Sequence, residues 1–271
     1  QIYVDNHFLP ASYGVYSSGK ELAENKSLLK VPLVIKVSSS SAGDGVYLCR
    51  DLAKLVDTLG KLKNYAGSIT TEQFIETKKN CGVQFGIKKD TGEVYILAIS
   101  EQITTEDGEF LGGIVNKNQS IYDAIQPAIY HLKNKILPYA YSKNWYGVGC
   151  FDILIDLNDK PYFIDANFRM TGMTAGIFHL LNSNEKASLC TFTGTFTGSR
   201  NEFIKNVVDL ANKENGWLNI LSLSQNDDVW RFNLSFFYNN NAELTRKCRI
   251  LRDNGVVSKI FEYNHLIKDS R

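Results

Sequence analysis

The hydrophobic positions of the chain fall into short runs and periodic stretches that predict strands and helices in mixed order. Residues 33–37 form an apolar, β-branched run typical of a buried strand, and residues 46–49 predict a second strand. In residues 50–62 the apolar positions recur at helical spacing, which predicts an amphipathic helix. The same patterns predict strands at 69–75, 83–87 and 94–102, and a long helix at 121–135 that ends before Pro138.

A sharply marked hairpin follows this helix. Two apolar stretches, 148–156 and 162–166, flank a polar turn at 157–160, which predicts a pair of antiparallel strands. After residue 192 the hydrophobic pattern changes. It predicts a helix at 201–214, strands at 217–223 and 229–238, and a helix at 242–253.

These elements predict an α+β fold in three parts. Residues 1–75 and 76–190 are expected to form two subdomains. Residues 195–271 are expected to form a small appended α-β-β-α module.

Composition and charge narrow the class of protein. The 271 residues carry 30 basic and 29 acidic side chains, a net charge of +1, and no basic stripe of the kind that nucleic-acid binders use. The five cysteines are odd in number and form no CxxC pair, which favours free thiols in a reducing compartment and hence a cytoplasmic protein. No apolar run reaches the roughly 18–20 residues of a membrane span. We therefore expect neither nucleic-acid nor membrane partners.

The first candidate for chemistry is Lys36, which ends the strand 33–37 and precedes a Ser/Gly-rich loop from Ser38 to Gly45. Small residues let backbone N–H groups approach phosphate oxygens, and a lysine supplies a counter-charge. The order differs from that of a P-loop, in which the lysine follows the glycines. Taken alone, the segment is more simply a hairpin loop with an incidental lysine.

The second candidate is an acidic pair in the predicted hairpin. Asp152 and Asp165 are 13 residues apart on strands joined by a short turn, so antiparallel pairing brings them onto one face. With the amide carbonyl of Asn167 they offer hard oxygen ligands, which suit Mg²⁺. Arg169 lies on the same face by strand alternation and can hold a phosphate or carboxylate bidentately. The alternative is a solvated hairpin edge held by salt bridges.

The third candidate, residues 71–76, is an ordinary edge segment by itself, and the order of all three gives them weight. A strand ending in lysine with a Ser/Gly loop, an acidic-aromatic-aliphatic connector, and an Asp…Asp-x-Asn-x-Arg hairpin together resemble the ATP-grasp superfamily of carboxylate–amine ligases. The resemblance covers about residues 9–182. It implies the ATP-grasp fold, in which the subdomains 1–75 and 76–190 grip ATP between their sheets. It implies that the N-terminal domain normally found upstream, with its first ATP-binding lysine, is missing here.

The resemblance implies nucleotide-binding roles for the first and third motifs. Lys36 is expected to contact the α- and β-phosphates of ATP, and Glu72, Phe74 and Ile75 to line the adenine site. Gln84 stands where a ribose-binding glutamate is common. The loop expected to close over the phosphates contains Ser38, Ser39, Ser40, Ser41, Gly43 and Gly45.

The resemblance also implies the roles of the hairpin residues and the reaction. Asp152, Asp165 and Asn167 are expected to bind two Mg²⁺ ions, and Arg169 is the expected catalytic residue, which stabilises the transferring phosphoryl group and the acyl phosphate. A carboxylate would be activated as an acyl phosphate and joined to an amine, with release of ADP and phosphate.

The expected partners are small-molecule or peptide substrates, together with an upstream domain or an oligomer partner. Residues 167–174 are similar to the corresponding stretch of pheganomycin-type peptide ligases, which points to peptide-bond formation. Two alternatives stay open. Bicarbonate could be the phosphoryl acceptor, as in carboxylases, or the chain could bind ATP without catalysis.

Overall fold

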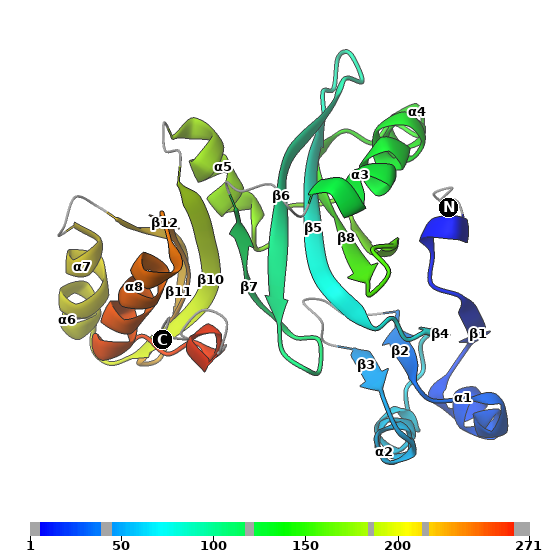
Figure 1. Cartoon of the computed structure of the whole chain (residues 1–271). Helices are drawn as coiled ribbons and strands as arrows, with labels where there is room; N and C mark the ends of the chain where they lie inside the picture. The colour runs from blue at the N-terminus through cyan, green and yellow to red at the C-terminus, as the bar shows by residue number, and fades with distance from the viewer. Residues whose placement is uncertain (1–5, 39–44, 117–121, 184–186, 213–216, 263–271) are drawn as a thin grey trace.

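The computed structural model describes residues 6–38, 45–116, 122–183, 187–212 and 217–262, which build two sheets of unequal size (Figure 1). The smaller sheet has four strands and the larger has eight. All strand pairs in both sheets are antiparallel, and helices pack against them. The predicted α+β class is therefore confirmed.

The small sheet belongs to the N-terminal part of the chain and has the strand order β1-β4-β2-β3. Asp51 begins the second helix of this part, because its side chain accepts a hydrogen bond from the backbone N–H of Lys54 at 2.8 Å. Fully buried Leu33 and Ile35 lie at the centre of its core. The elements are β1 (Ser12–Tyr16), α1 (Gly19–Glu24), β2 (Leu33–Val37), β3 (Val46–Cys49), α2 (Leu52–Leu62) and β4 (Ile69–Gln73).

The large sheet has the order β11-β12-β10-β7-β6-β5-β8-β9. Its strands are β5 (Thr77–Ile87), β6 (Val94–Thr104), β7 (Phe110–Val115), β8 (Gly147–Asp156), β9 (Pro161–Asn167), β10 (Ser188–Thr197), β11 (Leu218–Asn226) and β12 (Val229–Tyr238). The longer helices around it are α3 (Tyr122–His131), α4 (Leu137–Ser142), α5 (Thr174–Asn182) and α8 (Asn241–Asp253). Shorter pieces are α6 (Arg200–Phe203), α7 (Asp209–Asn212), π-helical turns at Leu132–Ile136 and Ile204–Val208, and 3₁₀ turns at Asn6–Phe8, Lys26–Leu28 and Lys259–Glu262.

The two faces of the large sheet are covered differently. On one face, α3 and α4 pack over β5, β8 and β9, while α6 and α8 pack over β10 and β12. Ile99 and Ile103 of β6 contribute to these two cores and thus point the same way. Gln102, between them and next to Ile103, points to the opposite face, where it contacts Asp152. On that second face α5 covers Leu189 of β10, beside the candidate site.

The C-terminal residues extend the large sheet. The predicted boundary between 190 and 195 falls inside β10, which pairs with β7 at Leu189–Phe192 and with β12 along its whole length. The predicted module 195–271 therefore shares strands and a core with the preceding residues (Figure 1). Local periodicity identified these strands but carries no information about which distant strand each one joins.

Candidate active site

The acidic pair lies in the hairpin formed by β8 and β9. Asp152 pairs directly with Asp165, and Cys150 pairs with Asn167. The register shifts immediately beyond this point, because Ile153 pairs with Phe163 and one residue of β9 is left over. Such a bulge increases the local twist and can aim side chains differently from a regular ladder. The predicted hairpin, with its two aspartates opposite each other, is confirmed.

Asn167 bridges the two carboxylates. Its Nδ2 donates hydrogen bonds to Oδ2 of Asp152 at 3.2 Å and to Oδ2 of Asp165 at 3.0 Å. The amide N–H groups thus take the place of a cation between two negative groups. If the amide rotates, the same three side chains present only oxygen atoms to the same point. This donor set fits Mg²⁺, which protein sites often bind through one or two carboxylates, with phosphate oxygens and water completing its octahedron.

The described residues contain no cluster of three or more His, Cys, Asp or Glu side chains suited to a metal. Asp152 and Asp165 are therefore the carboxylates available at this point, and Asn167 completes the set. A cation here would depend on oxygen atoms from a bound phosphate for much of its coordination.

Asp152 is the half-buried member of the pair, and Asp165 is exposed. Burial raises the pKa of Asp152 to about 6, and repulsion from Asp165 acts in the same direction. Hydrogen bonds oppose this shift: Nε2 of Gln102 donates to Oδ1 at 2.6 Å, and the Cys150 thiol donates to the same oxygen at 3.5 Å. Burial also raises the pKa of the Cys150 thiol well above its usual value. The site thus holds a carboxylate whose charge is costly until a cation compensates it.

Lys36 connects the small sheet to this hairpin. Its Nζ lies 2.7 Å from Oε2 of Glu72 and donates to the backbone carbonyl of Ile164 at 3.0 Å. Glu72 is reached because β2 and β4 are neighbours in the small sheet, and Ile164 immediately precedes Asp165. The structure therefore brings the first, second and third motifs together through a single ammonium group.

The predicted phosphate loop is described only at its two ends. Val37 and Ser38 donate backbone hydrogen bonds to Gly45 and Ser68, at 3.0 and 2.9 Å. Gly45 has a φ of 82°, a conformation that glycine adopts without strain. The loop residues Ser39, Ser40, Ser41 and Gly43 lie outside the described residues.

The predicted adenine-site residues lie where the chain passes between the sheets. Strand β4 ends at Gln73 and β5 begins at Thr77, so Phe74 and Ile75 belong to the connection. The guanidinium carbon of Arg50 lies 4.6 Å from the centre of the Phe74 ring, while Ile75 is buried. One face of the Phe74 ring is thus covered by a cation, a contact that the sequence did not predict.

Gln84, the predicted ribose contact, is a buried residue of β5. Its side chain is 1% exposed. Its Nε2 donates to Oγ1 of Thr171 at 2.8 Å, and its Oε1 accepts from Oγ1 of Thr174 at 3.1 Å. Both ends of the amide hydrogen-bond to the protein itself, and the expected contact with the nucleotide stays a prediction.

Asn80 is a residue of this face that the sequence analysis missed. It lies four positions before Gln84 on β5, and hence on the same face. Its buried Oδ1 has no hydrogen-bond partner among the described residues. A buried carbonyl without a donor is costly, and a ligand hydroxyl or amide would satisfy it. Strand alternation beginning at the inter-sheet connection could have identified this position.

Arg169 is exposed and lies two residues after the end of β9. Its Nη1 donates to the backbone carbonyl of Met170 at 3.2 Å. No carboxylate pairs with this guanidinium within the part of the chain that the structure describes, so most of its N–H donors face outward. It can therefore receive a phosphate or carboxylate of a ligand without first breaking an ion pair.

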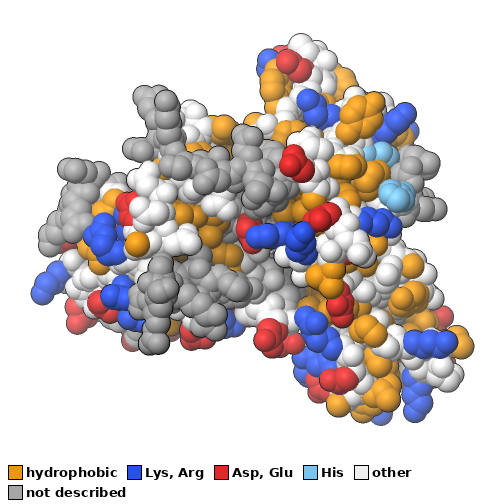
Figure 2. Space-filling view, in the orientation of Figure 1, with side chains coloured by type: hydrophobic (Ala, Val, Ile, Leu, Met, Phe, Trp, Pro, Cys, Tyr) orange, Lys and Arg blue, Asp and Glu red, His pale blue; other side chains and the backbone are white. Residues whose placement is uncertain are grey.

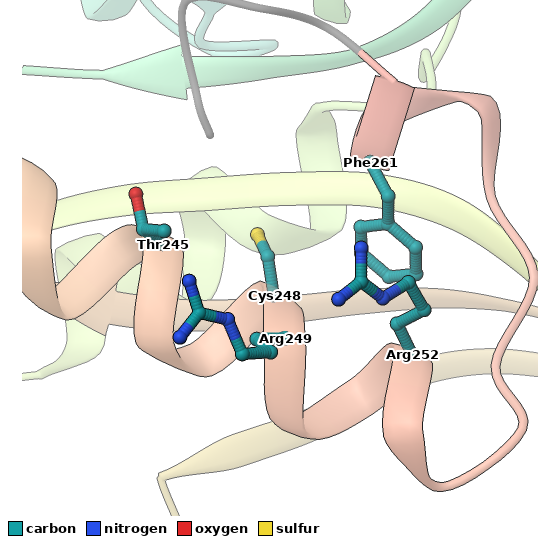
Figure 3. A pocket seen from close by; sticks show the side chains of 5 residues that line it. All are labelled: Thr245, Cys248, Arg249, Arg252 and Phe261. Carbon is teal, nitrogen blue, oxygen red and sulfur yellow. The ribbon is translucent and has the colours of Figure 1, made fainter. Parts of the chain in front are cut away.

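A separate hollow of about 140 Å³ lies far from these residues in the fold. It is lined by Thr245, Cys248, Arg249, Arg252 and Phe261, and Figure 3 shows the two arginine side chains on α8. Cys248 and Phe261 belong to the core on the opposite face of the large sheet from Asp152. None of the predicted site residues lines this hollow.

The face of the molecule in Figure 2 carries basic and acidic side chains intermixed, without a large area of either charge.

Solved structures with the same fold cover nearly the whole chain. N5-carboxyaminoimidazole ribonucleotide synthetase, in its ADP complex, is 17% identical with a TM-score of 0.65, and the match covers 92% of this chain and 69% of that one. The biotin carboxylase domain of Hydrogenobacter thermophilus 2-oxoglutarate carboxylase, crystallised with MgADP, ADP and bicarbonate, is 14% identical with a TM-score of 0.60, covering 98% and 72%. Phosphoribosylamine–glycine ligase of Thermotoga maritima is 15% identical with a TM-score of 0.58, covering 94% and 73%.

The fold, together with a matching family model, places the chain among the ATP-grasp enzymes. The family described as "L-aspartate–L-methionine ligase, ATP grasp" matches residues 13–167, which is more than half of the chain. The chain belongs to this family and is an ADP-forming carbon–nitrogen ligase. The predicted superfamily is therefore confirmed, whereas the narrower likeness to pheganomycin-type ligases stays a prediction.

No helix within the described ranges is long and apolar enough to cross a membrane.

Proposed function

We propose that this enzyme forms a peptide bond between two amino acids, using L-aspartate as the carboxylate and L-methionine as the amine, the pair named by its family. The single observation that carries the proposal is the bridged aspartate pair. Asp152 and Asp165 face each other, with Asn167 within 3.2 and 3.0 Å of their carboxylates. Two carboxylates held this close favour a site that is completed by a cation and the phosphates of ATP.

In the proposed reaction, an oxygen of the substrate carboxylate attacks the γ-phosphorus of ATP, and ADP leaves. The resulting acyl phosphate is attacked at its carbonyl carbon by the neutral amine. Phosphate departs with the electron pair of the C–O bond, and the nitrogen loses a proton to give the amide. Bound Mg²⁺, two ions in this proposal, supplies charge neutralisation on the phosphates.

The protein residues act by position and charge. Lys36 would exchange its contacts with Glu72 and Ile164 for the phosphates of ATP, which offer it a stronger counter-charge. Arg169 would hold the transferring phosphoryl group or the acyl phosphate with its planar fork. Asp152, Asp165 and Asn167 would hold the cation, and Glu72, Phe74, Ile75 and the Ser38–Gly45 loop would surround the nucleotide.

The direct test is to incubate the protein with Mg-ATP, L-aspartate and L-methionine and to identify the products by mass spectrometry. We expect ADP, phosphate and an aspartyl–methionine dipeptide in equal amounts. Each amino acid alone should release little ADP. Lys30 is exposed, and the variant Lys30→Met serves as a positive control that should keep full activity. Arg169→Ala should bind ATP but form little dipeptide.

Two outcomes would contradict the proposal in different ways. Release of ADP that depends on bicarbonate and not on amino acids would indicate carboxylase-type chemistry. ATP binding without turnover, in the presence of all twenty amino acids taken in pairs, would indicate a nucleotide-binding protein without ligase activity.

A further inference from the structure

Between β9 and α5 lies a short loop, Phe168–Met173, which carries Arg169. Both ends of the loop are packed: the Phe168 ring lies 4.7 Å from that of Trp145, and Met173 is 1% exposed. The residues between them are more exposed. A loop anchored only at its ends would leave the Arg169 backbone free to shift, and small displacements of catalytic groups are costly.

Gln84 supplies the missing anchor in the middle of this loop. Its amide donates to the Thr171 hydroxyl at 2.8 Å and accepts from the Thr174 hydroxyl at 3.1 Å. The Thr174 hydroxyl in turn accepts from the backbone N–H of Thr171 at 2.8 Å. These three bonds form a closed network that ties the loop and the first turn of α5 to β5.

In this network the Gln84 amide both donates a hydrogen bond and accepts one. Glutamine does both, whereas an ionised carboxylate only accepts. The position is buried, and Gln84 pairs with Cys150, two residues before Asp152. A negative charge here would add to the electrostatic cost that already raises the pKa of Asp152. Glutamine thus fits this network without adding a charge near Asp152.

We infer that Gln84 is a positioning residue, which acts through Thr171 and Thr174 to hold the Arg169 loop in place over the aspartate hairpin. This inference rests on the proposed function only for the role of Arg169. It assigns to Gln84 a task other than contact with the nucleotide. The residue therefore affects the rate of the reaction and leaves ATP affinity unchanged.

The catalytic test compares Gln84→Met, which keeps the side-chain volume, with Thr171→Val and the double variant. We expect calorimetry to give the wild-type Kd for Mg-ATP in all three. Turnover measured as ADP release should fall on the order of tenfold to a hundredfold, as is typical when a supporting residue is lost. The double variant should lose no more than the worse single variant, because both changes break one network.

Two further variants sharpen the catalytic test. Thr171→Ser retains the hydroxyl and should recover most of what Thr171→Val loses. Gln225→Met makes the same substitution on exposed β11 and controls for the chemical change itself. If Gln84→Met instead weakens ATP binding tenfold or more, and if its effect adds to that of Thr171→Val, Gln84 contacts the nucleotide and the inference is wrong.

A second measurement does not depend on ligase activity. Hydrogen exchange on the ligand-free protein should show faster exchange in the loop 168–174 in Gln84→Met and Thr171→Val, with β10 unchanged. Unchanged exchange in the loop of a folded Gln84→Met protein would overturn the inference, whatever the enzyme makes. The two proposals can fail separately. If the wild-type protein forms no dipeptide but the variants still show faster exchange in the loop, the proposed function is wrong and the inference about Gln84 stands.

Discussion

At the scale of single residues, the site brings together polar groups that hydrogen-bond to one another. Asp152 is half-buried, and Gln102, Cys150 and Asn167 donate hydrogen bonds to it. These donors reduce the cost of its charge without removing it, because burial still raises the pKa to about 6. Such a carboxylate favours any ligand that brings positive charge, which is consistent with a cation site.

The raised pKa of Asp152 predicts a pH dependence of stability. An unfolded aspartate has a pKa near 3.9, so between about pH 4 and 6 the folded protein binds more protons than the unfolded chain. The free energy of unfolding should therefore fall as pH rises through this window, by on the order of 3 kcal/mol from this group. Without Mg²⁺, Asp152→Asn should be more stable than wild type at pH 7.5 and equal to it below pH 4.

Urea denaturation at several pH values measures this difference. Asp90→Asn, in the exposed turn between β5 and β6, is the matched control and should show no such trend. A stability difference for Asp152→Asn that is the same at every pH would show that the carboxylate titrates alike in the folded and unfolded chain.

At the scale of elements, short connections decide where the functional groups lie. The bulge in β9 separates the regular apolar part of the hairpin from the pair Asp152 and Asp165. Lys36 of β2 then connects the two sheets, because its ammonium group donates a hydrogen bond to the backbone carbonyl of Ile164 in β9. Because this donor also pairs with Glu72, its removal should leave a half-buried carboxylate without its partner.

Replacement of Lys36 by Met should therefore affect both ligand binding and the free protein. We expect the Kd for Mg-ATP to rise at least tenfold, equivalent to about 1.4 kcal/mol, because a phosphate counter-charge is lost. The ligand-free variant should be slightly less stable than wild type, because the Glu72 carboxylate loses its ion-pair partner. Adding Glu72→Gln should restore this stability. Calorimetric titration and thermal melting separate the two effects. An unchanged Kd in folded Lys36→Met would remove Lys36 from the nucleotide site.

Helix α3 shows how an element can continue past a predicted stop. The sequence predicts that the helix ends before Pro138, yet a π-helical turn at Leu132–Ile136 is followed by α4 through Ser142. Pro138 lies in the first turn of α4, where its missing N–H is not required. Buried Leu132, Ile136 and Leu137 keep this irregular segment packed on the sheet. Tertiary packing here outweighs the local signal.

At the scale of the whole molecule, one eight-stranded sheet carries both the site and the C-terminal residues. The core around α8 draws Ile103 and Leu111 from β6 and β7, and Phe192 and Phe232 from β10 and β12. This core therefore cannot be assigned to residues 195–271 alone. The site face and this core are the two sides of a single sheet.

Removal of the C-terminal residues should consequently damage the site-bearing part. We expect a fragment of residues 1–190 to aggregate or to melt well below the intact protein, because Leu111 would lose its buried neighbours and β7 would lose much of its pairing with β10. Thermal melting and size-exclusion chromatography measure this. A fragment that melts like the intact protein would instead support a separate C-terminal module.

The sequence by itself determined the α+β class, most strands, the hairpin and the superfamily. These depend on local periodicity and on the order of short motifs, which a single chain displays directly. Tertiary structure alone decided that β10 joins β7, that the Gln84 amide bonds to Thr171 in the Arg169 loop and that Lys36 reaches Ile164. Each of these is a contact between segments far apart along the chain. Periodicity shows which face of an element is buried, but the partner on that face is chosen by the packing of the whole fold.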